Sequence, residues 1–557
     1  MIPQHRVGPI LSRRAALTTG AAAFLAPALA RSEEPALLIS GGPIHTGAAA
    51  GTVEAIAIRG DRIVFVGALA EARQAVPGAR SIDLTGAAAF PGFVDSHVHL
   101  TEVGIREMTL SLEGTASIAE LQSRLGAWAK ANPTGIVNGR GWIETHWPEG
   151  RFPTRDDLDA VVADRPVYLE RADGHAGVVN SKALEVLAIG PSTQPPAGGE
   201  ILRDAKGRPT GMFVDNAQSL LDGVITRPTT AIRREALSRA DRLYASRGWA
   251  GVHFMSVEKD DLDVMRGMAA AADLGLRIDA YMDPSGAAEV LATGPSVDAS
   301  GRVRLRGIKL YADGALGSRG AALLAPYSDK PGSMGLLVTP HDRMVDLMRQ
   351  AMAKNAQVAV HAIGDRGNRL TLDAMAEVLG AAHTDRRWRI EHAQIISPED
   401  LPRFAAMGVI ASMQPSHAIG DLYFAPSRLG MERLKGAYAW RSLLASGAVV
   451  CAGTDAPVEK GDPLIEFYAA VYRHALNGYA GPGWGPDETV SRAQALKMLT
   501  LAPAYAVGRE AELGTLEVGK RADLTAFSKD LMTVEPADIL KATATLTITA
   551  GRVTHQV

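Results

Sequence analysis

The chain has 557 residues, of which 46% are hydrophobic and 21% are charged, a composition too apolar for a disordered protein and a length too great for one small domain. It carries 58 lysines and arginines against 61 acidic residues, so neither a basic nucleic-acid surface nor an acidic tail is indicated. The single cysteine, Cys451, excludes an intrachain disulfide and any cysteine-rich metal site. A metal site in this chain would therefore consist of histidines and carboxylates.

Residues 1–30 have the features of an export signal. Arg13 and Arg14 precede a short, apolar, alanine-rich run that ends in a small-residue cleavage site at Ala30. The paired arginines resemble a twin-arginine signal, and the run is too short to anchor the protein in a membrane. We therefore expect a periplasmic protein with no membrane anchor after cleavage. An alanine-rich first helix of the folded domain is the alternative.

Short strands separated by turn residues are predicted at both ends of the mature chain, within residues 31–90 and 506–557. Two half-sheets at opposite chain ends both need partners for their edges. We expect the two sets to pair with each other in a small β-sandwich built from both chain ends.

Between these ends, in residues 91–505, apolar runs of strand length alternate with stretches of helical periodicity. Eight such runs are centred on residues 93–99, 251–255, 277–281, 307–311, 358–361, 388–392, 409–413 and 449–455. Eight parallel strands favour an α/β fold with a closed (β/α)₈ TIM barrel over an open sheet. The gap at about residues 100–248 is far longer than one crossover needs. It predicts a large subdomain inserted after strand 1, which we expect to cover the barrel mouth.

Metal-binding side chains occur at the carboxyl ends of several predicted strands. His97 and His99 occupy alternate positions of one strand, so both project to the same side and can chelate one divalent ion. A lone His-x-His is a weak signal. It gains weight because the carboxyl ends of four other strands carry the residues Lys309, His361, His392 and Asp455. A barrel brings its catalytic groups together at this end, so the sequence predicts a single site there.

Several segments are similar to the motifs of one superfamily, namely residues 91–99, 173–175, 180–181, 307–314, 360–365, 391–394 and 453–458. Together with residues 519–524 they extend over essentially all of the mature chain. They resemble the amidohydrolase superfamily, and within it the amidohydrolase-3 branch that includes N-substituted formamide deformylases. The motifs are specific for the superfamily and much less so for the substrate.

The resemblance implies six metal ligands: His97, His99, Lys309, His361, His392 and Asp455. It also implies that Lys309 is carboxylated and bridges two ions, which chemistry supports because a carbamate presents anionic oxygens whereas an ammonium has no lone pair. The alternative is an ordinary barrel lysine paired with Asp313, in which case a mononuclear site on His97, His99, one further histidine and Asp455 remains. Zinc is the first expectation, as one or two ions, with manganese and iron as alternatives.

These features predict a metal-dependent hydrolase that cleaves a non-peptide, amide-type C–N bond, linear or cyclic, in a small-molecule substrate. A divalent ion lowers the pKa of bound water to about 7, so a metal-bound hydroxide would attack the carbonyl. Asp455 would orient that water, take its proton and pass it to the leaving nitrogen. The alternative for Asp455 is a helix N-cap.

Three other functions remain open at this point: deamination or lactone opening at the same metal site, and a non-catalytic periplasmic binding protein. No nucleic-acid partner is expected. The oligomeric state is open, a homo-oligomer included.

Four residues are predicted to contact the substrate: His175, Asn180, Trp142 and Arg319. His175 and Asn180 lie in the insertion, where a structural hydrogen bond is the alternative for each. Trp142 would supply an apolar wall, although tryptophan more often packs in a core. Arg319 would face an anionic group of the substrate or pair with a nearby carboxylate.

Overall fold

The structure, a computed structural model, describes residues 35–225, 228–380, 386–481 and 483–557. The predicted export signal at residues 1–30 lies outside these described residues. Residues Ala36–Val557 form one compact unit. Among the described residues, no helix combines the length and the apolarity that crossing a membrane requires.

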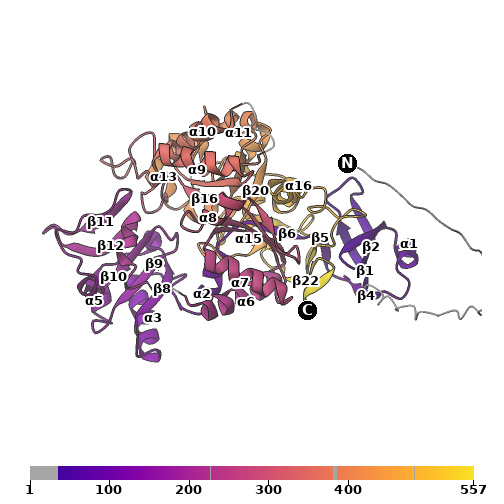
Figure 1. Ribbon diagram of the computed structural model, residues 1–557, viewed down its shortest axis with the longest axis horizontal. Helices are drawn as coiled ribbons and strands as arrows, with labels where there is room; N and C mark the ends of the chain where they lie inside the picture. The colour runs from indigo at the N-terminus through magenta and orange to yellow at the C-terminus, as the bar shows by residue number, and fades with distance from the viewer. Residues whose placement is uncertain (1–34, 226–227, 381–385, 482) are drawn as a thin grey trace, which may run out of the picture. The chain divides into compact units, whose positions relative to one another are not determined.

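Eight parallel strands form the path of the central sheet (Figure 1), and a ninth, short strand, β15 (Ser296–Val297), pairs antiparallel with one of them, β16. In sheet order the eight are β6 (Phe93–Val98), β13 (Trp249–Val257), β14 (Arg277–Met282), β16 (Val303–Tyr311), β17 (Gln357–Ala362), β18 (Arg389–His392), β19 (Ile410–Met413) and β20 (Val450–Ala452). The last and first strands meet just beyond β20, where Val98 bridges Ala456 and the His99 N–H donates to the Ala456 carbonyl over 2.9 Å. The predicted parallel barrel is therefore confirmed in a nearly closed form.

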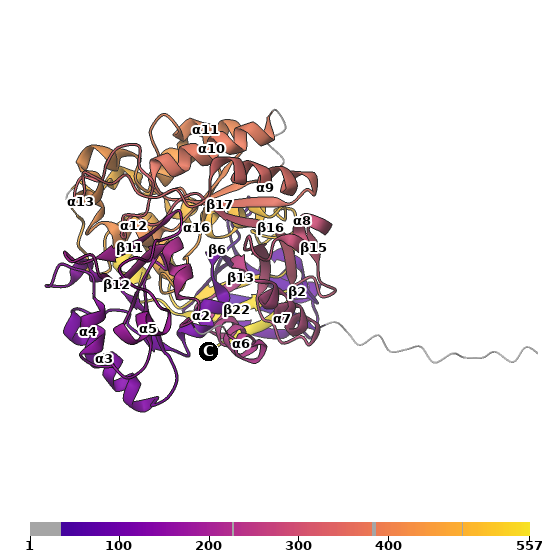
Figure 2. The same cartoon turned by 60° about the vertical axis from the view of Figure 1, so that its left-hand side comes forward.

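Helices follow the barrel strands along the chain, and α9 shows how one of them packs. In α9 (His341–Ala353), the buried residues include Met344, Met348 and Ala351, whose spacing gives one apolar stripe toward β16 and β17. Figure 2 shows α9 beside the next helix, α10 (Asp365–Leu379). The other α-helices of this region are α2 (Leu100–Arg106), α6 (Thr230–Arg247), α7 (Lys259–Ala270), α8 (Ala288–Thr293), α11 (Leu401–Met407), α12 (Pro415–Asp421), α13 (Ala425–Leu429), α14 (Trp440–Ala445), α15 (Pro463–Tyr472), α16 (Arg492–Leu499) and α17 (Leu501–Ala506).

A second sheet occurs in the chain between β6 and β13. In sheet order its strands are β11 (Gly199–Arg203), β12 (Pro209–Asp215), β10 (Ala176–Val179), β9 (Val167–Arg171), β8 (Val137–Trp142) and β7 (Leu110–Ser111). The helices of this segment are α3 (Ile118–Ala131), α4 (Arg155–Asp159) and α5 (Ser181–Val186). Its apolar residues form clusters of their own, one of them around Trp142, Leu169 and Val178. The sheet lies where the sequence predicts an inserted subdomain.

Strands from both ends of the described chain share a third, mixed sheet. Its members are β1 (Ala36–His45), β2 (Thr52–Arg59), β3 (Arg62–Gly67), β4 (Arg80–Asp83), β5 (Ala88–Pro91), β21 (Leu524–Phe527), β22 (Ala544–Thr549) and β23 (Arg552–Gln556). The two chain ends join where β5 pairs antiparallel with β21. Phe90 contacts Phe93 of the first barrel strand at a ring distance of 6.1 Å. A sandwich of two facing layers, and the domain boundaries predicted from the sequence, stay predictions.

Candidate metal centre

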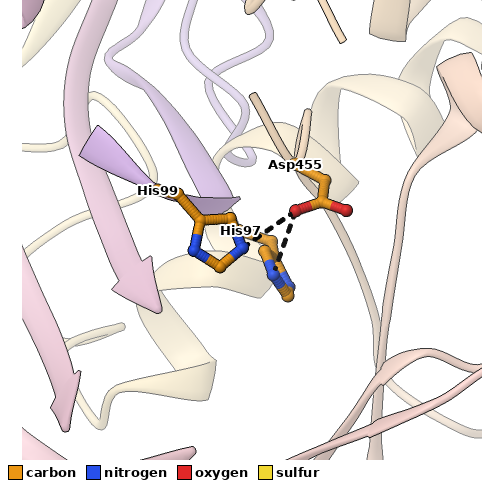
Figure 3. A group of neighbouring side chains, drawn as sticks. All are labelled: His97, His99 and Asp455. Atoms are coloured by element: carbon orange, nitrogen blue, oxygen red, sulfur yellow. Dashed lines mark ion pairs between the residues drawn. The ribbon is translucent and has the colours of Figure 1, made fainter. Parts of the chain in front are cut away.

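Three side chains converge at the seam between the first and last barrel strands. His97 lies in β6, His99 directly follows that strand, and Asp455 lies just beyond β20. The Nε2 atoms of His97 and His99 lie 3.3 and 3.2 Å from Asp455 Oδ1 (Figure 3). The backbone holds this approach, because the Asp455 N–H donates to the His97 carbonyl over 2.7 Å. Two imidazoles and a carboxylate at this spacing have the composition of a metal site.

Hydrogen bonds determine which ring nitrogen carries the proton in two of the histidines. His97 Nδ1 donates to the Glu391 carboxylate over 2.7 Å, and His392 Nδ1 donates to the Gln414 side-chain oxygen over 2.7 Å. The Nε2 atom of each ring therefore keeps its lone pair. A metal ligand needs this form, and such a hydrogen bond also orients the ring.

Burial keeps the histidines of this cluster neutral. It lowers the pKa of His97 to about 4, and the neighbouring Lys309 adds to the shift. Burial likewise holds the pKa values of His361 and His392 well below the usual value. The rings are contiguous, with centroids 4.9 Å apart for His97 and His392 and 4.5 Å apart for His361 and His392. At neutral pH these imidazoles are available as ligands without losing a proton first.

The surroundings of one buried oxygen of Asp455 indicate whether a cation fits at this site. Asp455 Oδ1 has no hydrogen-bond partner among the described residues. Because the proton of His97 is on Nδ1, the Nε2 lone pair of His97 faces this oxygen at 3.3 Å, one acceptor toward another. Such a contact away from water is unfavourable unless a cation lies between the two atoms. The residues therefore fit a divalent ion, and His97, His99 and Asp455 would hold it.

Lys309, on β16, reaches the same cluster. Its buried Nζ lies 3.5 Å from His97 Nε2 and 4.9 Å from the centre of the Tyr311 ring. Burial lowers the pKa of Lys309 to about 8. The structure does not pair Lys309 with Asp313, because the Asp313 carboxylate instead accepts three backbone N–H groups over 2.8 to 2.9 Å. Lys309 is thus directed at the histidines.

A cavity of about 640 Å³ lies against the cluster, and its walls include His99, Lys309, His361, His392 and Asp455. This volume is typical of pockets that bind small molecules. Arg140 and Asp173, from the segment between β6 and β13, line the same cavity. The barrel and the second sheet therefore share one pocket.

His175 also lines this cavity. Its Nδ1 donates to Asp215 Oδ1 over 2.7 Å, and its ring centroid lies 4.9 Å from that of His361. Burial would lower the pKa of His175, but the hydrogen bond and the charge of Asp215 raise it to about 9. At neutral pH His175 is therefore a cationic hydrogen-bond donor beside the histidine cluster.

Three other residues predicted to contact substrate lie elsewhere. Asn180 is fully buried at the start of α5, and its side-chain amide bonds only backbone groups of the second-sheet segment. Trp142 is buried in the core of that sheet, where it donates to the Leu169 carbonyl over 3.0 Å. Arg319 pairs with Asp329 at 2.9 Å. None of these three residues lines the cavity. Asn180 caps a helix, Trp142 packs in a core and Arg319 forms an ion pair, and their contact with substrate stays a prediction.

His417, in α12, is a site residue that the sequence reasoning missed. Its Nε2 lies 3.8 Å from Asp455 Oδ2, its ring centroid lies 5.9 Å from that of His392, and it lines the cavity. The available signal was its position four residues after β19, where the chain leaves the carboxyl end of a barrel strand.

A buried ion pair supports His97 from behind. Arg389 and Glu391, both on β18, are fully buried and in contact. Arg389 also donates to the Ser96 carbonyl over 2.6 Å. Burial would raise the pKa of Glu391, but Arg389 and His97 lower it to about 2. An ionised carboxylate therefore orients His97 and increases its basicity as a ligand.

An eight-stranded β/α barrel with histidines and an aspartate at the carboxyl ends of its strands is the arrangement of a metal-dependent hydrolase. The comparison with known families agrees: the model of the amidohydrolase family matches residues 80–555. The chain belongs to the amidohydrolase family.

Similar proteins cover nearly the whole chain. The Bacillus subtilis protein YtcJ is 32% identical over 495 residues, which make up 86% of this chain and 91% of YtcJ. N-substituted formamide deformylase from Arthrobacter pascens is 29% identical over 496 residues, or 86% of this chain and 90% of that enzyme. A solved metal-dependent hydrolase from Pyrococcus horikoshii has a TM-score of 0.74 at 29% identity and covers 90% of this chain and 99% of its own.

Proposed function

We propose that this amidohydrolase cleaves a non-peptide, amide-type C–N bond, linear or cyclic, in a small molecule. The observation that carries the proposal is the convergence of His97 Nε2 and His99 Nε2 on the unpartnered Oδ1 of Asp455, with His99 and Asp455 in the wall of the cavity. The similarity to N-substituted formamide deformylase supports an amide-type bond over a ring amine or a lactone.

The chemistry divides between the ion and the side chains around it. A divalent ion held at this site makes hydroxide available at neutral pH, since it lowers the pKa of a bound water to about 7. Asp455 orients the attacking water, takes its proton and passes it to the leaving nitrogen. His175, held by Asp215, donates a hydrogen bond to the substrate carbonyl oxygen, where negative charge develops during the attack.

We propose zinc as the ion, because histidine and carboxylate ligands in a buried site suit it, with manganese and iron as the alternatives. We also propose that Lys309 is carboxylated. Its buried Nζ, 3.5 Å from His97 Nε2, supports this proposal because a carbamate there would place anionic oxygens among the ligands.

Two further proposals concern the surroundings of the site. The segment at about residues 100–248 covers the barrel mouth and shapes the substrate pocket, which its contribution of Arg140, Asp173 and His175 to the cavity walls supports. The mature protein is periplasmic. The twin-arginine-type pattern at residues 1–30 supports this location.

The activity is tested on purified protein with N-substituted formamides as probes. We expect hydrolysis that is lost in chelator and restored by zinc or manganese, with about one to two equivalents of metal bound. Asp455→Asn should lower kcat by at least about 10²-fold while retaining much of the metal. Folded, metal-free protein without turnover would favour a binding protein, and release of ammonia from a ring amine would favour a deaminase.

A further inference from the structure

The cavity beside the metal centre is strongly acidic. Nine aspartates and glutamates line it against four lysines and arginines. Two of the arginines are already paired, Arg140 with Glu170 at 3.1 Å and Arg171 with Asp173. One divalent ion would offset only part of the remaining excess. The pocket therefore has a negative potential, which attracts cationic small molecules and disfavours anionic ones.

The acidic residues of the cavity differ in whether the chain supplies a counter-charge. Four of them form an ion pair with an arginine, namely Glu113, Glu170, Asp173 and Glu258. Asp455 faces the histidines of the metal centre. The other four form no ion pair with a lysine or arginine of the described residues, and they are Glu102, Asp283, Asp421 and Glu459. These four are the acids with which a bound cation could pair.

Asp421, the last residue of α12, has a fixed carboxylate. Its Oδ2 atom accepts hydrogen bonds from the Tyr438 hydroxyl and, over 2.7 Å, from Gln394 Nε2. Its Oδ1 atom accepts no hydrogen bond from the part of the chain that the structure describes, and Asp421 lines the cavity. Two donors on one oxygen therefore orient this carboxylate and leave its other oxygen for a ligand.

Glu459 lies beside the same end of α12. Its Oε1 atom is 3.7 Å from the position that a Cβ atom on Gly420 would occupy. Its carboxylate has no hydrogen bond or ion pair with any described residue, the neighbouring, exposed Lys460 included. Burial raises the pKa of Glu459 to about 8, and the charges of Asp421 and Asp455 add to the shift. Asp421 and Glu459 therefore repel each other, and a cation between them would relieve this repulsion.

Glu102 and Asp283 are less suited to hold a cationic group. Glu102 follows His99 by three residues, so a metal ion at His99 would offset part of its charge. Asp283 Oδ1 accepts the backbone N–H and the hydroxyl of Ser285 over 2.9 and 2.7 Å. Asp421 and Glu459 are therefore the pair of acids that most lacks a counter-charge.

We propose that the substrate carries a cationic nitrogen group, of the alkylammonium or guanidinium type, which binds between Asp421 and Glu459. This inference rests on the proposed function and names the substrate class for it. The amide bond of the substrate would lie at the metal centre, and the cationic group would donate its N–H bonds to the two carboxylates.

The chain limits the distance between the two ends of such a substrate. Glu459 follows Asp455 by four residues, so their Cα atoms are separated by at most about 14 Å. The cavity wall also includes Leu316 and Phe424, which offer apolar surface to a hydrocarbon spacer. We therefore expect a short aliphatic chain between the amide and the cationic group.

The test compares two formamides of the same shape. N-(4-aminobutyl)formamide is a cation at pH 7, because an alkylamine has a pKa of about 10. N-pentylformamide is its neutral counterpart, with a methyl group in place of the ammonium. We expect kcat/KM of the zinc-loaded wild type to be at least about 10-fold higher for the cationic formamide.

Glu459→Gln and Asp421→Asn each remove one charge and keep the shape of the side chain. In both variants the ratio of kcat/KM for the cationic formamide to that for the neutral one should fall toward one. Asp342→Asn, which removes an exposed charge on α9 outside the cavity, is the matched control and should keep the wild-type ratio. The ratio distinguishes a cation site from a structural role, because a damaged fold would lower both values of kcat/KM alike.

Two results would overturn the inference and leave the proposed function intact. They are equal values of kcat/KM for the two formamides in the wild type, and a wild-type ratio retained by both variants. Hydrolysis of neither formamide would count against the proposed function instead. Calorimetry of the wild type with the two compounds would then decide the inference, with tighter binding of the cation expected and equal affinities refuting it. Should Glu459→Gln fail to fold, Asp421→Asn and the wild-type ratio provide the same test.

Discussion

The buried Arg389–Glu391 pair on β18 has two roles: Glu391 balances the charge of Arg389, and it orients His97 as a ligand. Replacing Glu391 by glutamine should separate these roles. Glutamine keeps the shape of the side chain and can still accept the proton of His97 Nδ1, so the tautomer of His97 is preserved. The charge is lost, however. The amide N–H₂ group of the glutamine would take the place of Oε1 and face the Nε–H of Arg389, donor toward donor.

The structure sets the magnitude of each effect. Arg389 would keep only neutral partners, among them the Ser96 carbonyl, and a buried charge left without its counter-charge costs about 3–5 kcal/mol. Loss of the anion behind a metal-binding histidine typically weakens metal affinity by about 10–100-fold. Glu391→Gln should therefore lower both the melting temperature and the zinc affinity.

The double variant Arg389→Met, Glu391→Gln distinguishes the two roles. It removes the unpaired charge, so most of the lost stability should return, whereas zinc affinity should stay low because His97 still lacks its anion. Thermal melts of metal-free protein and competition with a zinc chelator measure the two quantities. Wild-type zinc affinity in Glu391→Gln, or a double variant as unstable as the single one, would refute the reasoning.

The same pair predicts a response to acid. The pKa of Glu391 is lowered from 4.5 to about 2 in the folded chain. Its contribution to stability is therefore complete above pH 4.5 and is lost as the pH falls toward 2. Glu391→Gln should flatten this part of the stability profile.

The remaining predictions concern the pocket and its surroundings. Asp215→Asn removes the carboxylate that raises the pKa of His175 to about 9. His175 is a cation below that pKa and neutral above it. In Asp215→Asn the alkaline limb of the pH profile of kcat/KM should therefore move to lower pH. A limb that does not move would argue against a cationic role of His175. Asn180→Ala should lower the free energy of unfolding by about 1–2 kcal/mol through the lost helix cap and leave KM unchanged. A raised KM would instead indicate that Asn180 contacts the substrate. Chelation should lower the melting temperature of the wild type, because an ion present at 1,000 times its Kd stabilises the fold by about 4 kcal/mol, and an unchanged melt would contradict a bound ion.

The barrel could be predicted because its signal is local. Each parallel strand is a short apolar run followed by a helical period, and alternation along one strand already places His97 and His99 on a common side. The carboxyl ends of all barrel strands also lie on one face of the barrel, so Asp455 and Lys309 could be predicted to lie in the same site.

The pocket walls could not be predicted in this way. Asn180 and Trp142 lie in a segment whose strand order is not sequential, so their surroundings depend on pairings between distant residues. Arg319 lies in an irregular stretch with a positive φ of 65°, where no period indicates which way a side chain points. His417 lies in α12, which is separated from the end of β19 by one residue, and the direction of its side chain is fixed only when α12 packs.

The three side chains proposed to hold the ion come from the strand that opens the barrel and its end, His97 and His99, and from Asp455, which follows the strand closing it. Most of the chain is synthesised between His97 and Asp455, so a growing polypeptide on the ribosome holds two histidines long before it holds the carboxylate. A binding site of this kind does not exist in any nascent fragment. An ion held by these three side chains would be captured only after translation has passed the eighth strand and the seam has joined, so metal loading would be a late step that depends on the completed fold.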